Sequence, residues 1–157
     1  MHVEIREAAP RKAICMAHHG PYFMIGGAFQ QLGQWLAENG VEHGEGIALY
    51  YDDPSATPPN ELRSDAGAFV SENFTTDDAR VHLVEVPGGV FAVGTHCGPY
   101  DGLPKAWGEL AGTWLPQSGR TLRRAPSFEV YLNDCTKVSP EELRTELYAP
   151  IDGPAGD

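Results

Sequence analysis

The segment SFEVYLND, residues 127–134, decides the expected fold, because its apolar and polar residues alternate strictly. Such alternation is typical of a half-buried β-strand with two different faces. Glu129 and Tyr131 lie on one face. The residues of the apolar face are Phe128, Val130 and Leu132. A carboxylate in the middle of a strand needs water, a partner group or a ligand. We therefore expect Glu129 to lie at the floor of a binding cleft.

A similar segment occurs 81 residues earlier in the chain. The sequence YYDD, residues 50–53, matches YLND, residues 131–134, at this offset. At the same offset PNELRSD, residues 59–65, matches PEELRTE, residues 140–146, and a closing strand is expected after each, near 66–70 and near 147–151. Together with the Gly-Pro-Tyr motif described next, these make four matched features in one order, which indicates an internal duplication.

The motif Gly-Pro-Tyr also occurs twice, at residues 20–22 and 98–100, each time between a strand pattern and a helix pattern. The two helix patterns carry apolar stripes with the same spacing. These stripes are Ile25, Phe29, Leu32 and Leu36 in the first, and Leu103, Trp107, Leu110 and Trp114 in the second. Helix-stop signals follow at Asn39-Gly40 and Ser118-Gly119, where the offset has grown from 78 to 79. The second copy therefore contains one extra residue. If Leu36 is paired with Leu115 and not with Trp114, this extra residue lies earlier in the helix.

These patterns predict an α+β fold in which a striped helix packs on alternating strands in two layers. We expect one domain, residues 1–157, made of two strand-helix-strand-strand units related by a pseudo-two-fold axis, with a ligand cleft between them. The first half spans about 1–71 and the second about 81–151. The acidic tail, residues 152–157, is expected to be flexible.

The repeat breaks at one position, because the offset of 81 places Glu129 opposite Ala48. We expect the apolar stripes of both strands to face the helices, and the alternate positions to face the cleft. The expected ligand-binding residues are Glu129, Tyr131, Tyr50, Ala48, Tyr22, Tyr100 and Trp107, the last with a packing role first. Apolar walls around one polar group suit a small molecule, and aromatic rings near a carboxylate suit a cation.

Glu129 has a second interpretation. It could pair with a nearby arginine (Arg123, Arg124 or Arg144) on an exposed sheet face, since charges on strands are most often solvated.

The composition excludes several classes of protein. A formal net charge of −11 opposes direct binding of nucleic acid, because the phosphate backbone is also negative. The longest apolar runs are too short for a membrane span, and the N-terminus lacks the pattern of a signal peptide. Three cysteines without CxxC spacing indicate reduced thiols, so we expect a cytoplasmic protein.

A metal site is the weaker interpretation of the polar residues before the two Gly-Pro-Tyr motifs. His18, His19, His96 and Cys97 fit no zinc spacing. A nucleophile pair of Cys97 and His96 is weaker still, because neighbours on a strand point to opposite faces. Glycine pairs at residues 26–27 and 88–89 do not form a phosphate-binding loop. We expect no metal and no cofactor.

Taken together, the motifs resemble the GyrI-like small-molecule-binding family from about Val3 to Ile151. The resemblance rests on residues 50–54, 58–65, 98–100, 114–116 and 126–134. It implies a duplicated fold with a cleft between the halves, and a glutamate at the position of Glu129 that contacts lipophilic cations. Members occur alone or fused to DNA-binding domains.

The resemblance implies three functions, which stay open at this point. The leading one is a binding module for small amphipathic or cationic molecules that gives protection against toxins or drugs. The alternative is a hydrolase of strained cyclopropane-containing toxins, with Glu129 as general acid or base and Tyr131 orienting the substrate. The third is inhibition of DNA gyrase, as a protein partner, through the acidic surface.

Overall fold

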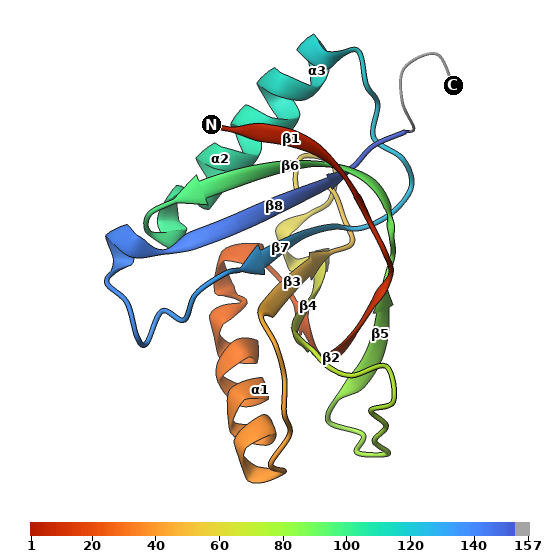
Figure 1. Ribbon diagram of the computed structural model, residues 1–157, viewed down its shortest axis with the longest axis vertical. Coiled ribbons are helices and arrows are strands. Elements are labelled where there is room, and N and C mark those ends of the chain that lie inside the picture. Colours follow the sequence, from red (N-terminus) through yellow and green to blue (C-terminus); the bar gives the residue numbers. More distant parts are fainter. Residues whose placement is uncertain (153–157) are drawn as a thin grey trace. The chain divides into compact units, whose positions relative to one another are not determined.

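The computed structural model describes residues 1–152, which form eight strands and two main helical segments (Figure 1). Beyond Asp152, the predicted flexible tail lies outside the described residues. The strands are β1 (Val3–Ala8), β2 (Arg11–His19), β3 (Gly46–Tyr50), β4 (Arg63–Phe69), β5 (His82–Val86), β6 (Gly89–Cys97), β7 (Ser127–Tyr131) and β8 (Arg144–Pro150). The longer helical elements are α1 (Gly26–Glu38), α2 (Leu103–Glu109), η4 (Leu110–Trp114) and α3 (Leu115–Ser118). Short 3-10 turns are η1 (Tyr22–Met24), η2 (Pro59–Glu61), η3 (Tyr100–Gly102) and η5 (Pro140–Glu142).

The chain divides into two compact units, each named here after its residue at the break in the repeat. The Ala48 unit is Pro10–Pro87, and the Glu129 unit is Met1–Ala9 together with the chain from Gly88 onward. Strands of the Ala48 unit lie in the order β5-β2-β4-β3, and those of the Glu129 unit in the order β1-β6-β8-β7. All neighbours within a unit are antiparallel.

In each unit a helical segment packs on one face of its strands. Buried side chains of α1 pack with Ile14 and Ala68 of the strands. Helical residues of the Glu129 unit pack with Leu147 and Ala149 of β8. Each unit is thus a helical layer on a layer of antiparallel strands, which confirms the predicted α+β fold class. The duplication, the pseudo-two-fold axis and the single-domain assignment stay predictions.

Strand pairing adds a feature that the sequence pattern does not show. β1, the first strand of the first predicted half, pairs with β6 of the second half. In the same way β5, from the second half, pairs with β2. The closing strands also begin earlier than the expected 66–70 and 147–151, because β4 starts at Arg63 and β8 at Arg144. The first residues of both strands are polar, so a search for apolar runs does not find where these strands begin.

The inserted residue of the second helix lies in η4, a π-helical turn between α2 and α3. A π-turn has i→i+5 hydrogen bonds and so accommodates one extra residue in an α-helix. At the start of η4, Leu110 is buried like Leu32, and directly after η4, Leu115 is buried like Leu36. The pairing of Leu36 with Leu115 is therefore the better one, and the predicted core stripe needs a correction at Trp114, which is only partly buried.

The two Gly-Pro-Tyr motifs form the same strand-to-helix turn. Gly20 and Gly98 have φ angles of 121° and 122°, a conformation that favours glycine. Their amides donate to the carbonyl oxygens of Leu62 and Leu143 at 2.8 and 2.9 Å. The turn fixes the start of each helix relative to its strands.

Candidate functional site: a buried acid with aromatic partners

Glu129, in the middle of β7, is buried with 2% of its surface exposed. Trp107 of α2 donates its indole N–H to Glu129 Oε2 at 2.7 Å. The hydroxyl of Tyr131 donates to Glu129 Oε1 at 2.8 Å. Each carboxylate oxygen therefore has a protein donor, which offsets part of the cost of burying the group.

The face of the strand on which Glu129 lies was predicted wrongly. Glu129 is paired in register with Leu147, which belongs to the cluster packed against the helices. Residues in register share a face, so Glu129 faces the helical layer, as its bond from Trp107 also shows. Ala48 likewise lies on the helix-facing side of its own unit. Its register partner is Ala66, which lies beside residues of β4 and β2 that pack against α1.

The predicted apolar stripe therefore faces away from the helices. Phe128 stacks on Tyr148 with ring centroids 4.6 Å apart and contacts Phe91 edge-on. The stripe is also shorter than expected, because Leu132 is 45% exposed. The reason for the error is that Phe128, Glu129 and Val130 are all buried. With both faces of a strand covered, alternation alone does not reveal which face the helix covers.

The alternative placement of Glu129 on an exposed sheet face is also wrong. Its side chain is buried, and the guanidinium groups of two of the candidate arginines bond to backbone carbonyls. Arg123 donates to the carbonyl oxygens of Gly88 and Ile151 at 3.1 Å each. Arg144 donates to the carbonyl of Leu143 at 3.0 Å.

Tyr100, the tyrosine of the second Gly-Pro-Tyr motif, extends the site. Its ring meets that of Tyr131 edge-on, with centroids 5.4 Å apart. Burial raises the pKa of Tyr100 to about 12, and the neighbouring Cys135, Asp134 and Glu129 groups add to the shift. The acid–aromatic cluster, as we call Glu129, Trp107, Tyr131 and Tyr100, is thus one connected group within the Glu129 unit.

The other predicted ligand-binding residues form a second group within the Ala48 unit. Tyr22 and Tyr50 pack with ring centroids 4.6 Å apart and are the equivalents of Tyr100 and Tyr131, whose centroids are 5.4 Å apart. The Tyr22 hydroxyl lies 2.9 Å from the carbonyl oxygen of Asp52, so it is engaged by the loop after β3. Ala48 is fully buried. The cleft between the halves stays a prediction.

The hydrogen bond that Trp107 donates is the feature of the candidate site that the sequence pattern did not reveal. Helix alignment places Phe29 at the equivalent position of the first copy. A phenyl ring has no hydrogen to donate, whereas an indole has one. The paired exchange of Ala48 for Glu129 and Phe29 for Trp107 was therefore a signal that the acid and the indole belong together.

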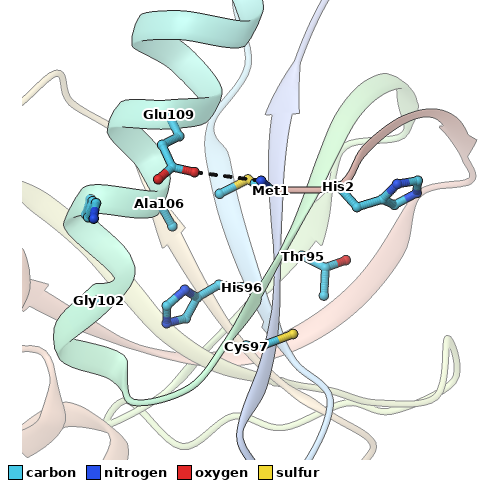
Figure 2. Close-up of a pocket in the computed structure, with 9 residues that line it drawn as sticks. Met1, His2, Thr95, His96, Cys97, Gly102, Ala106 and Glu109 are labelled. Carbon is cyan, nitrogen blue, oxygen red and sulfur yellow. Dashed lines mark ion pairs between the residues drawn. The ribbon is translucent and has the colours of Figure 1, made fainter. Parts of the chain in front are cut away.

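An open hollow of about 680 Å³ lies elsewhere in the Glu129 unit, beside α2 and the end of β6 (Figure 2). Figure 2 shows His96 pointing towards the helix at Gly102, whereas Cys97 points away from it. At the rim of the hollow, the Met1 amino group lies 4.0 Å from the Glu109 carboxylate. None of the described residues that line this hollow was predicted to bind ligand.

The histidines before the Gly-Pro-Tyr motifs have a local role. His18 Nε2 lies 3.0 Å from the carbonyl oxygen of Pro21, and His96 Nε2 lies 2.9 Å from that of Pro99. Among residues 1–152, no three His, Cys, Asp or Glu side chains are placed to hold a metal ion. No helix in this range is long and apolar enough to cross a membrane.

Comparison with known proteins places the chain in a family. Residues 1–152 match the model of the GyrI-like small molecule binding domain. A DNA gyrase inhibitor of Yersinia enterocolitica is 33% identical over 138 residues, which cover 85% of this chain and 88% of the relative. DNA gyrase inhibitor 2 of Dickeya dadantii is 35% identical over 150 residues, covering 93% and 94%.

Solved structures show the same fold. The EcmrR C-terminal domain has a TM-score of 0.77 and 20% identity, with 98% of each chain covered. SAV2435 bound to tetraphenylphosphonium has a TM-score of 0.67 and 16% identity, covering 98% of this chain and 95% of that one. The chain therefore belongs to the family of GyrI-like small-molecule-binding domains.

Proposed function

We propose that the chain binds small amphipathic cations at the acid–aromatic cluster, with Glu129 as the opposing charge. The observation that carries this proposal is the buried Glu129 carboxylate, held by Trp107 and Tyr131 at 2.7 and 2.8 Å. A folded protein has little reason to bury an acid among aromatic rings for stability alone, because desolvating the charge is costly.

The cluster has the chemistry that such a ligand requires. A carboxylate carries the negative charge that a cation requires, and its two oxygens are acceptors only. The faces of Trp107, Tyr131 and Tyr100 attract positive charge, at about 0.5–2 kcal/mol for each good contact. Both hydrogen bonds hold the carboxylate in place before a ligand arrives, which lowers the entropic cost of binding.

Two comparisons support this choice of ligand. The family is described as small-molecule binding. One structural neighbour, SAV2435, is bound to tetraphenylphosphonium, a cation covered by four phenyl rings. Ligands of this kind combine a permanent charge with aromatic surface, which are the two features that the acid–aromatic cluster complements.

Isothermal titration calorimetry with tetraphenylphosphonium tests the proposal. We expect Glu129→Gln to weaken binding about tenfold or more, since tenfold corresponds to the loss of only 1.4 kcal/mol. Glu146→Gln is the matched control. Glu146 lies between Thr145 and Leu147 in β8, so its side chain lies on the opposite face of the strands, where it bonds to Arg6. Equal affinities of the wild-type protein and Glu129→Gln would reject Glu129 as the binding group.

A second candidate function is inhibition of DNA gyrase. It is favoured by relatives of that name with 33% and 35% identity over most of this chain. The net charge of −11 makes the protein negative, like DNA, and a DNA-binding enzyme attracts negative charge. A supercoiling assay with purified gyrase tests it, and supercoiling that continues at full rate with excess protein would reject it. Inhibition that survives Glu129→Gln would place the activity on the surface rather than in the cluster.

A further inference from the structure

Two buried hydroxyl groups have no hydrogen-bond partner among residues 1–152. They are Ser64 Oγ in β4 and Thr145 Oγ1 in β8, with 2% and 0% of the residue exposed. The two residues occupy equivalent places in the repeated segments 59–65 and 140–146. An unpaired buried hydroxyl destabilises a fold, so its presence calls for an explanation.

Thr145 lies on the face of the strands that carries the acid–aromatic cluster. Its register partners are Tyr131 on β7 and His96 on β6. Glu129 precedes Tyr131 by two residues, so Thr145 and Glu129 are diagonal neighbours, with Cα atoms about 7–8 Å apart in such an arrangement. The two groups are therefore close enough for one small ligand to contact both.

The polar atoms beside Thr145 are directed elsewhere. The hydroxyl of Tyr131 donates to Glu129, and His96 Nε2 bonds with the carbonyl oxygen of Pro99. The Thr145 hydroxyl is thus left as an acceptor next to a buried acid. Ser64 has the same surroundings in register, Tyr50 and His18, but there the acid is replaced by Ala48.

We propose that Thr145 Oγ1 is a ligand-contacting group that selects primary ammonium ions over cations without N–H groups. This inference rests on the proposed function, since it names the class of cation that the Glu129 site prefers. A primary ammonium has three donors and can bond to Glu129 and Thr145 together. A quaternary ammonium or a phosphonium ion balances the charge of Glu129 but leaves the hydroxyl unpaired, and sites with buried polar groups discriminate against such ligands.

Calorimetry with two probes tests the inference, using diphenylmethylammonium and its N,N,N-trimethyl derivative. Thr145→Val removes the hydroxyl with little change in shape. We expect it to weaken binding of the primary ammonium about three- to tenfold and to leave binding of the trimethyl derivative within about twofold. Thr145→Ser keeps the hydroxyl and should keep the preference. Ser64→Ala is the matched control in the Ala48 unit and should change neither affinity.

A melting curve of Thr145→Val adds a readout that does not involve ligand. Because the hydroxyl bonds to no described residue, we expect a melting temperature equal to or above that of the wild-type protein. If Thr145→Val binds diphenylmethylammonium as tightly as the wild type while Glu129→Gln does not, Thr145 is not a ligand contact and the proposed function stands. If neither probe binds the wild-type protein, the proposed function fails and this inference with it.

Discussion

The Glu129 unit and the Ala48 unit share the order strand, helical segment, strand, strand, but they differ in the chemistry of one layer. In the Glu129 unit an indole from α2 donates to a buried carboxylate on β7. In the Ala48 unit Phe29 and Ala48 stand at these two positions, which therefore hold neither an acid nor an indole donor. The acid and its donor differ together, which indicates that they act as a pair.

The loops after β3 and β7 share several of their hydrogen bonds. Asp53 accepts hydrogen bonds from the amide and hydroxyl of Ser55, and Asp134 accepts the same two bonds from Thr136. The amide of Arg63 donates to the side chain of Asp52 in one unit. In the other unit the amide of Arg144 donates to the side chain of Asn133. The shared framework holds the strands, and the exchanged pair supplies the proposed site.

Placing an acid in the Ala48 unit should have the largest effect. Ala48 is fully buried, so Ala48→Glu buries a carboxylate without an indole donor. We expect the free energy of unfolding to fall by about 4 kcal/mol, as for other buried charges that lack a partner. Adding Phe29→Trp should restore about 2 kcal/mol, the contribution of one hydrogen bond to a charged group. Urea denaturation measures both values, and an Ala48→Glu protein as stable as the wild type would contradict the comparison.

Removing the donor from the Glu129 unit should have an intermediate effect. Trp107→Phe gives this unit the residue of the Ala48 unit and leaves Glu129 Oε2 without its indole donor. We expect a loss of about 2 kcal/mol in the free energy of unfolding, typical of a hydrogen bond to a charged group. The control is the same substitution in a Glu129→Ala background, where it should cost less. Equal costs in the two backgrounds would show that the indole acts only through packing.

The smallest predicted effect concerns pH. Burial first, and then the nearby Cys135, Asp134 and Glu129 groups, raise the pKa of Tyr100 to about 12 from an ordinary value of 10.0. A group whose pKa is higher in the folded state loses its stabilising contribution as pH rises from about 10 to about 12. The free energy of unfolding should therefore fall less steeply across this window in Tyr100→Phe than in the wild-type protein. If the free energy of unfolding fell equally with pH in both proteins, Tyr100 would make no contribution to the pH dependence.

The α+β fold was predictable because its signals are local. Helical spacing, strand alternation and the Gly-Pro-Tyr turns each depend on a few neighbouring residues. Features that depend on distant residues were missed. β1 pairs with β6 although 80 residues lie between their ends, and no local pattern in Val3–Ala8 indicates that partner.

The site was predictable in part. Glu129 stood out because its counterpart is Ala48, and the structure joins it to Tyr131, Trp107 and, through Tyr131, to Tyr100. The face on which Glu129 lies was not predictable, since β7 is buried on both sides. Thr145 gave no signal at all, because a threonine in a strand is ordinary until its lack of a hydrogen-bond partner is visible.

The most direct test of the account uses the indole N–H resonances of the three tryptophans in a ¹H–¹⁵N spectrum. Trp107 donates to Glu129 in one unit, and Trp35 donates to Asp78 at 2.8 Å in the other, so the two report on the units separately. Titration with tetraphenylphosphonium should shift the Trp107 resonance, assigned through Trp107→Phe, and leave the Trp35 resonance in place. A shift of the Trp35 resonance with an unchanged Trp107 resonance would contradict the assignment of ligand binding to the acid–aromatic cluster.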